Sequence, residues 1–409
     1  VLIGTFWTLY FAIVTSAVSR RSRSFRWVFA ALSVSLVLIR CFSMFNFPVD
    51  WDERTYSRAA LRYAEKILAL RFDEIPTVDY NYEHPALIKL AYSIPIVLDG
   101  HRSFERVGIP VNLHAAVSGE IHVSYRAVSV FFNLLLAQFL IYLIHPLAGF
   151  YLMIHSIMAE FGSTVRLESI PMLFSFLSVY CAWEALRKIE APDDGAAAFD
   201  SKRWLLSALF LGITAAAKLI HCVVAVAIGV VWIRAMIRGT KVRGKLLRIT
   251  MLYALIVIVG FFVFNPSSYY DPIGTVKSMV EFHLNFQENM AGHQPWYQPL
   301  VWITRSVPIA LPGNGVLNPV QENPFGFVFA ADEIIFILAL LGLRTMFRRN
   351  GIYLLWLIFG VTFMFFWGTK GQQYAATVTV PICIAATYGT FELMQKLEKY
   401  NAESGNDRS

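Results

Sequence analysis

The stretch WVFAALSVSLVLIRCFSMFNFPVDWDERTYSR, residues 27–58, places two adjacent carboxylates, Asp52 and Glu53, just after a long apolar run. The run, residues 27–47, is long enough to cross a bilayer as a helix, since about 20 apolar residues suffice. Such runs recur, and 56% of the 409 residues are hydrophobic. Only 15% are charged, whereas a soluble domain carries about 25%. The sequence therefore predicts an all-α polytopic membrane protein.

The apolar runs predict about eleven transmembrane helices. They lie at residues 1–19, 27–47, 124–145, 146–162, 168–186, 204–217, 219–236, 249–265, 326–343, 351–367 and 375–394. A further apolar segment, residues 86–98, is short for a span and contains Lys89 and Pro95. Segments of this kind lie at the interface or re-enter the membrane.

The basic clusters favour one topology. They lie at residues 20–26, 187–203, 234–248, 344–350 and from Lys396 onward. If the segment 86–98 does not cross, every cluster falls on one side, which the positive-inside rule identifies as the cytoplasm. If it crosses, every later cluster changes side. We therefore expect one transmembrane domain, residues 1–409, with large exoplasmic loops at 48–123 and 266–325 and a cytoplasmic tail at 395–409.

The first exoplasmic loop is expected to begin with an amphipathic helix on the membrane surface. Apolar and aromatic residues follow Asp52 at intervals of 4, 3, 4 and 3, at Tyr56, Ala60, Tyr63, Ile67 and Leu70. This spacing defines one face of a helix. Two interpretations of Asp52 stay open here: it caps this helix, or it takes part in chemistry.

More charged and polar side chains lie at predicted exoplasmic ends of segments. They are Glu83, His84, Arg166, Glu168, Lys218, His221, Lys370 and Tyr374. Each one alone fits an interfacial side chain whose charged group reaches the headgroups. Together they indicate a pocket beside the lipid with both acids and cations. Such a pocket suits head-group transfer from a lipid-linked phosphate, which needs a base for the acceptor hydroxyl and cations for the phosphate.

Six motifs, in this order, carry a resemblance to a known family. They are DWDERTYSRAALRYAE (50–65), YEHPAL (82–87), RAVSVFFNLLLAQFLIYL (126–143), STVRLESIPMLFSF (163–176), AAAKLIH (215–221) and TKGQQYAATVTVPI (369–382). The set resembles the GT-C superfamily of integral-membrane glycosyltransferases, above all the protein O-mannosyltransferase-like and lipid A aminoarabinose transferase group. Each motif is loose, but the ordered set runs through most of the chain.

The resemblance implies a GT-C-type helix bundle with interfacial helices in the first loop, and a role for each matched residue. Asp52 aligns with the catalytic base. Substrate contacts are implied at Glu83, His84, Arg166, Glu168, Lys218, Lys370 and Tyr374. Glu53 is a further substrate-site candidate, expected to orient a neighbouring group. Glu83 is implied to contact the phosphate or a divalent metal ion, the one cofactor expected.

Some features depart from the family pattern. The usual HPP is HPA here, with Ala86, and Glu168 stands where Asp is common. The loop 266–325 is too short for an inserted β-domain, which argues against a eukaryotic-type protein mannosyltransferase. Three of its residues, His293, Trp296 and Tyr297, are candidate sugar or acceptor contacts. An aromatic belt at the membrane interface explains these residues equally well.

The predicted function is an inverting glycosyltransferase, either a hexosyl- or a pentosyltransferase. The donor is expected to be a polyprenyl- or dolichyl-phosphate sugar, and the acceptor a hydroxyl of a protein, glycan or lipid. The active site is expected to face outward from the prokaryotic plasma membrane, with no nucleic-acid partner. The alternative is a transporter or flippase of a lipid-linked or anionic substrate, because charges within the membrane also mark ion paths. The enzyme requires Asp52, Glu168 and Lys218 to converge in one cavity.

Overall fold

The computed structural model describes residues 23–46, 51–99, 119–189, 199–240, 242–290, 295–306 and 331–406. The predicted span 1–19 and the candidate contact His293 lie outside these residues. Within the described ranges the chain forms α-helices and short 3-10 helices, and no β-strand. The predicted all-α class is confirmed.

The helices follow the apolar runs of the sequence. In chain order they are α2 (Arg23–Asn46), α3 (Trp51–Leu68), η1 (Phe72–Thr77), α4 (Leu87–Asp99), α6 (Gly119–Leu143), α7 (Pro146–Ile154), α8 (Ser156–Phe161), α9 (Ser169–Leu186), η2 (Arg187–Ile189), α10 (Ser201–Ala217), η3 (Leu219–Val223), α11 (Val224–Arg238), α12 (Arg243–Val263), η4 (Pro266–Ser268), α13 (Pro272–Met290), α14 (Gln298–Thr304), α17 (Ala331–Phe366), η6 (Gln372–Tyr374) and α18 (Ala376–Asn406).

Seven helices of the described residues are long and apolar enough to cross a membrane. They are Arg26–Phe45, Ser124–Leu143, Ser169–Leu186, Leu219–Arg238, Arg243–Val263, Ala331–Phe366 and Ala376–Asn401. The longest, α17, is interrupted at Asn350, whose backbone is not helical (φ −145°, ψ 59°). The two predicted spans 326–343 and 351–367 therefore correspond to the two halves of α17. The chain is an integral, multi-pass membrane protein.

Two predicted spans are shorter helices within the same bundle. The predicted span 146–162 is a pair of helices, α7 and α8, which are separated at His155. The backbone of His155 is extended, so α7 ends just before this residue and α8 begins just after it. The predicted span 204–217 is α10, which packs against both α9 and α12.

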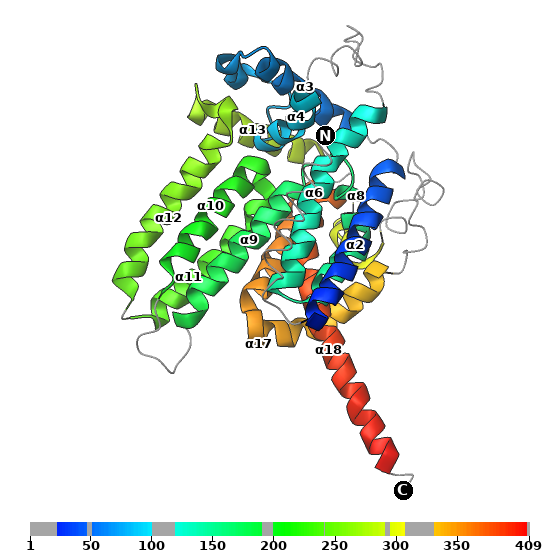
Figure 1. The fold of residues 1–409 in the computed structure, drawn as a ribbon. Helices are drawn as coiled ribbons and strands as arrows, with labels where there is room; N and C mark the ends of the chain where they lie inside the picture. The colour runs from blue at the N-terminus through cyan, green and yellow to red at the C-terminus, as the bar shows by residue number, and fades with distance from the viewer. Residues whose placement is uncertain are drawn as a thin grey trace.

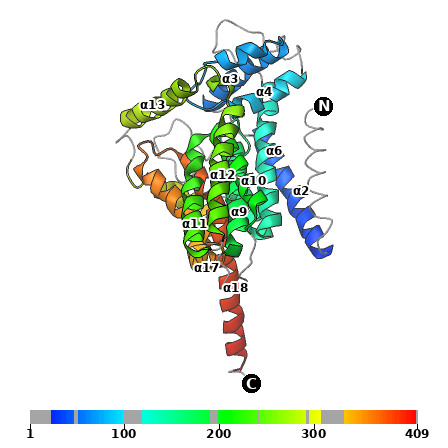
Figure 2. The same cartoon turned by 90° about the vertical axis from the view of Figure 1, so that its left-hand side faces the viewer.

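The helices form a bundle with one covered end. In Figures 1 and 2, α3, α4 and α13 lie across one end of the bundle, which we call the capped end. The end of α9, the start of α10, the end of α11, the start of α12 and the C-terminal end of α18 lie at the opposite end (Figure 1). The basic residues at these helix ends are thus far from the capped end, as the predicted topology requires.

The backbones of α17 and α18 approach each other closely at two glycines. A Cβ atom on Gly342 would collide with the backbone carbonyl of Ala385, and one on Gly389 with that of Leu338. Small residues permit such contact between membrane helices, where dispersion forces and not the hydrophobic effect hold helices together.

The surface helix predicted after Asp52 is α3. Its side chains Tyr56, Ala60 and Tyr63 are buried, as the spacing predicted. The last predicted member, Leu70, lies beyond the helix end with a positive φ of 56° and is exposed. The buried face packs on α4, a helix of 13 residues that is too short to span. Residues 87–98 are therefore a helix too short to span the bilayer, and their position at the membrane interface stays a prediction.

Candidate active site

A cavity of about 610 Å³ lies at the capped end. Its polar lining comes from six separate segments and comprises Asp52, Thr55, Tyr56, Asn81, Glu83, His84, Arg166, Glu168, Lys218, His283, Gln373 and Tyr374. Its apolar lining includes Leu219, Ile220, Val223, Val226, Val280, Leu284, Phe282, Phe286, Phe363 and Trp367. The structure thus brings Asp52, Glu168 and Lys218 into one cavity, the arrangement that the enzyme requires.

Asp52 lies in the first turn of α3 and receives a hydrogen bond from Nη1 of Arg166. The Arg166 guanidinium packs over the Phe161 ring at 5.3 Å, and its Nη2 lies 3.9 Å from Oε1 of Glu160. These contacts fix the direction of the guanidinium. Burial, and then the negative charge of Glu168, raise the pKa of Asp52 above its usual value, while Lys218 opposes this shift. Asp52 is therefore a stronger base than an ordinary aspartate.

Glu168 and Lys218 form a buried ion pair beside this aspartate. Lys218 Nζ donates to Glu168 Oε1 at 2.5 Å, and the two side chains are 9% and 1% exposed. Lys218 directly follows the last residue of α10, and its backbone is extended. Glu168 directly precedes the first residue of α9. The second carboxylate oxygen, Oε2 of Glu168, is buried and has no hydrogen-bond partner within the described ranges. Because such an atom is costly to bury, it is suited to accept a hydrogen bond from a ligand.

The turn before α4 forms another wall of the cavity. Asn81 has a left-handed backbone (φ 61°), and its side-chain amide donates to Glu83 Oε1 at 2.5 Å. Lys89, from the first turn of α4, donates to the carbonyls of Asn81 and His84 at 2.7 and 2.8 Å. Burial lowers the pKa of Lys89, and the charge of Glu83 opposes the change. Lys89 thus holds the turn in place.

Two histidines meet at this turn. The His84 and His283 rings are 5.5 Å apart, and Nε2 of His283 lies 3.1 Å from the backbone oxygen of Glu83. Burial is the main cause that lowers the pKa of both histidines, and the Lys218 charge lowers it further. Both imidazoles are therefore neutral near pH 7, able to form hydrogen bonds without adding positive charge.

The Glu83 carboxylate has a hydrogen-bond partner within the protein. In the described part of the chain, no group of three or more His, Cys, Asp or Glu side chains could hold a metal ion. The Glu83 carboxylate accepts from Asn81, and His283 faces a backbone oxygen instead of that carboxylate. Stable protein sites usually supply three or four ligands. Glu83 therefore shapes the cavity wall in this structure, and the metal contact expected from the resemblance stays a prediction.

The structure places the side chain of Glu53 outside the cavity lining. This side chain is fully buried. Both carboxylate oxygens accept from Arg126, at 2.8 and 2.6 Å, and Oε2 also accepts from the backbone N–H of Val165. This network joins α3 to α6 and to the segment that carries Arg166, so it agrees with the expected orienting role and gives no support to a direct substrate contact. A lone arginine at the start of an apolar run, as Arg126 is, already indicates a buried partner.

The Glu53–Arg126 pair is expected to contribute to stability. Replacing Glu53 with Ala leaves the Arg126 guanidinium buried without its carboxylate, which costs about 3–5 kcal/mol. The measurement is thermal unfolding of the purified protein in detergent. The matched control is Glu65→Ala on the same helix, whose carboxylate is half exposed and lies 3.8 Å from Arg71. An unchanged unfolding temperature in E53A together with lost donor binding would instead restore Glu53 as a substrate contact.

Lys370 is a second candidate substrate contact that lies outside the cavity lining. Its Nζ donates to the carbonyls of Met364 and Phe365, at 3.0 and 2.6 Å, and to that of Trp367. These are the last carbonyls of α17, which lack partners within the helix, so Lys370 caps the helix end. It does not line the cavity. The geometry therefore gives no support to the expected phosphate contact at this lysine.

Tyr374, from the same motif, does line the cavity. Its ring meets the edge of the Trp367 ring at a centroid distance of 6.2 Å. Trp302 Nε1 donates to the Lys370 backbone oxygen at 2.5 Å. The lysine thus stabilises the loop between α17 and α18, and the tyrosine at the end of that loop faces the substrate space.

The two aromatic candidates of the second predicted loop, Trp296 and Tyr297, do not line the cavity. Trp296 and Tyr297 are 70% and 49% exposed, and Trp296 packs near Phe365. Arg305, which follows α14, is exposed and also does not line the cavity. These positions favour the interfacial-belt explanation for the two aromatic residues.

Several cavity residues carried no sequence signal of function. Tyr56 looked like one buried position of an amphipathic helix, and Asn81 like a turn residue. His283 lies in α13, within a segment that had been expected only as a long loop. Trp367 ends an apolar run, where a tryptophan is ordinary. Their placement in the cavity depends on contacts between distant segments, which no local pattern reveals.

The fold and the cavity together define an all-α integral-membrane protein with a polar cavity at one end of its helix bundle. The crystal structure of ArnT from Cupriavidus metallidurans in the apo state is similar to this chain, with a TM-score of 0.52 and 15% sequence identity. The similarity covers 90% of this chain and 60% of the ArnT chain, so this protein spans somewhat over half of its length. No protein-family model and no curated protein sequence matches the chain. The likeness shows a shared fold.

Proposed function

We propose that this protein is an inverting glycosyltransferase that moves a sugar from a polyprenyl-phosphate donor to an acceptor hydroxyl. One observation carries the proposal. Three carboxylates and two cations, contributed by Asp52, Glu83, Glu168, Arg166 and Lys218, share a cavity whose remaining wall is largely apolar. The fold supports it, because ArnT, a protein whose solved structure is similar to this chain, is a glycosyltransferase.

The two cations are suited to bind the donor phosphate. Arg166 offers a rigid fork of N–H donors, and Lys218 offers a compact charge that is 9% exposed. As the bond between the sugar and the phosphate breaks, negative charge grows on the phosphate oxygens. Fixed cations in a site shielded from water stabilise that charge more than water does. A phosphate is itself a weak base, so departure of the lipid phosphate requires no general acid.

Asp52 is suited to act as the base. It takes the proton of the acceptor hydroxyl while the hydroxyl oxygen forms a bond to the anomeric carbon. The bond from that carbon to the phosphate oxygen breaks in the same step, and polyprenyl phosphate leaves with the electron pair. A single displacement inverts the anomeric configuration, without the covalent intermediate of retaining enzymes. The unpartnered Oε2 of Glu168 is placed to accept a hydrogen bond from a sugar hydroxyl.

The apolar lining supports a lipid carrier. Leu219, Ile220, Val223 and Val226 line the cavity at the start of the chain segment that becomes α11. Val226 is 47% exposed, so this wall continues to the outer surface of the bundle. A polyprenyl chain can therefore stay among apolar side chains and lipid while its phosphate reaches the cations. Since the basic segments lie at the opposite end, we propose that the site faces the outside of a prokaryotic plasma membrane.

As the pH is lowered, activity is expected to be lost at a higher pH than the one at which an ordinary aspartate becomes protonated. Asp52 acts only when ionised, and its pKa is raised above 3.8, chiefly by burial. As the pH falls through this raised pKa, Asp52 gains a proton and the base is lost. The measurement is kcat/KM of the wild-type protein against pH. A half-maximal point at or below pH 3.8 would contradict the assignment of Asp52 as the base.

The proposal is tested by turnover in proteoliposomes. Purified protein is incubated with a panel of radiolabelled polyprenyl-phosphate sugars and with acceptors of three kinds, peptide, glycan and lipid. Release of polyprenyl phosphate together with labelled product supports a glycosyltransferase. Movement of an intact lipid-linked sugar between leaflets, with no cleavage of any donor, would support the transporter alternative instead.

A further inference from the structure

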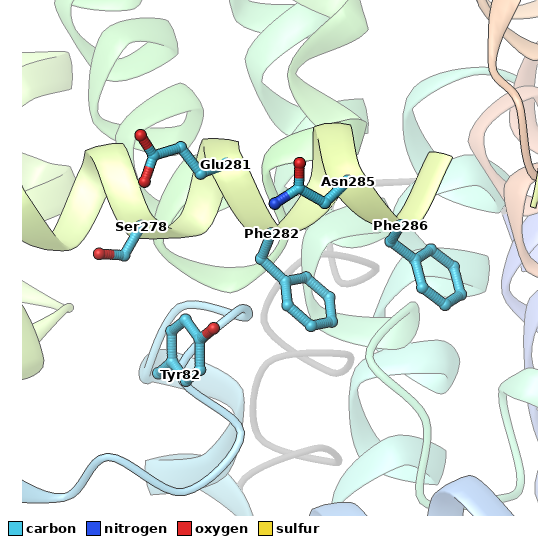
Figure 3. Close-up of a pocket in the computed structure, with 6 residues that line it drawn as sticks. All are labelled: Tyr82, Ser278, Glu281, Phe282, Asn285 and Phe286. Carbon is cyan, nitrogen blue, oxygen red and sulfur yellow. The ribbon is translucent and has the colours of Figure 1, made fainter. Parts of the chain in front are cut away.

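We propose that a second groove, beside the cavity, binds a neutral saccharide that forms part of the acceptor. The groove has a volume of about 410 Å³ and is lined by Tyr82, Ser278, Glu281, Phe282, Asn285 and Phe286. We call it the α13 groove, since five of the six residues belong to α13 (Figure 3). The proposal rests on the proposed function, because it names the class of acceptor that the glycosyltransferase uses.

Aromatic rings form one wall of the α13 groove. The rings of Phe282 and Phe286, one helical turn apart, are nearly parallel, with an angle of 8° and centroids 6.0 Å apart. Tyr82 meets Phe282 at 6.0 Å and 77°, edge to face. Figure 3 shows both phenylalanines leaving α13 on the same side, towards the turn that carries Tyr82. The faces of such rings carry negative charge density, which favours contact with the polarised C–H groups of a sugar ring.

Polar groups accompany the rings on the same helix. Ser278, Glu281 and Asn285 contribute a hydroxyl, a carboxylate and an amide, and the spacing of three and four residues brings them together on one side of α13. Sugar hydroxyls both donate and accept hydrogen bonds. The hydroxyl and the amide here can do both, and the carboxylate accepts. Small-molecule sites typically combine an apolar wall with a small number of polar groups that point towards the same space.

The charge of the α13 groove favours a neutral ligand. Its lining residues include one charged side chain, Glu281, which lies 3.7 Å from Lys277 of the same helix. A carboxylate repels an anionic ligand, and the two phosphate-binding cations of the catalytic cavity have no counterpart among these six residues. We therefore assign the groove to a hydroxyl-rich, uncharged sugar instead of a second phosphate group.

The α13 groove adjoins the catalytic cavity. Phe282 and Phe286 line both spaces, and Val280 and Leu284 of the same helix belong to the apolar lining of the cavity. The helix α13 thus stands between the two spaces. A donor lipid on the cavity side and an acceptor saccharide in the groove would meet at these two phenylalanines, so that one acceptor hydroxyl enters the cavity.

Direct binding of defined saccharides tests this inference. Full-length protein in lipid nanodiscs is mixed with maltotriose, cellotriose or chitotriose, and contact is measured by saturation-transfer NMR. The wild type is expected to bind at least one of them. The double variant Tyr82→Ala/Asn285→Ala is expected to bind it on the order of tenfold more weakly, because a stacking contact and a hydrogen bond are lost together. Neither residue lines the catalytic cavity.

The control variant is Tyr297→Ala, which removes an exposed aromatic ring that lines neither space. It is expected to bind saccharide like the wild type, and thermal unfolding confirms that both variants are folded. Wild-type protein that binds none of the three sugars, or a double variant that binds them unchanged, overturns the inference. Donor cleavage in the same samples is a separate readout. If it persists without saccharide binding, the proposed function stands and the groove assignment fails. If the double variant binds saccharide more weakly and the control does not, but no donor is cleaved, the groove assignment stands and the proposed function fails.

Discussion

Asp52→Asn is expected to lower the rate of sugar transfer by on the order of 10²–10⁴-fold, the usual contribution of a general base. The amide has nearly the shape of the carboxylate and still accepts the hydrogen bond from Arg166. It cannot take a proton from the acceptor hydroxyl. Donor binding is therefore expected to change much less than kcat. The measurement is single-turnover transfer in proteoliposomes, together with equilibrium binding of the donor lipid.

The matched control for this variant is Asp79→Asn. Asp79 is exposed, lies in the same region of the chain and does not line the cavity. It is expected to retain wild-type transfer. Equal transfer by D52N and the wild type would remove Asp52 as the base. If D79N loses as much transfer activity as D52N, the loss comes from the change in surface charge and not from the chemistry of the cavity.

Lys218→Met is expected to impair both stability and donor binding. The substitution leaves the Glu168 carboxylate buried without its cation, which costs about 3–5 kcal/mol of folding free energy. It also removes a charged hydrogen bond to the donor phosphate, with a contribution of about 1.5–3 kcal/mol, or roughly 10- to 150-fold in affinity. Thermal unfolding measures the first effect, and the donor dissociation constant measures the second.

A double variant separates the two roles of Lys218. In Lys218→Met/Glu168→Gln both charges of the buried pair are absent, so the folding penalty is expected to be largely relieved. The donor affinity is expected to stay low, because the cation is still missing. If the double variant regains both stability and donor affinity, Lys218 serves only to neutralise Glu168, and the phosphate is bound elsewhere.

The sequence was sufficient to predict the apolar helices of the bundle, but neither α13 nor the partners of the charged side chains. Apolar runs of sufficient length dictate transmembrane helices because the bilayer leaves few alternatives for the backbone. The predicted spans correspond to helices wherever the structure describes them, including the two halves of α17. The amphipathic spacing after Asp52 correctly identified the buried face of α3 as far as Tyr63.

The two displaced site residues show where local patterns fail. Glu53 and Asp52 are neighbours on α3, yet consecutive helical residues point about 100° apart, so only one of them faces the cavity. Lys370 lies four residues after the end of α17, a position where a lysine either caps carbonyls or reaches a ligand. The choice depends on the path of the following loop. Tyr374, a few residues later in the same motif, does face the cavity.

The most direct test of the account is a structure of the full-length protein bound to a polyprenyl-phosphonate analogue of the donor sugar. The account predicts that the phosphonate oxygens lie within hydrogen-bond distance, about 2.7–3.2 Å, of Lys218 Nζ and the Arg166 guanidinium. The anomeric carbon should face Asp52. A phosphonate bound outside this cavity, with Lys218 still paired only to Glu168, would contradict it.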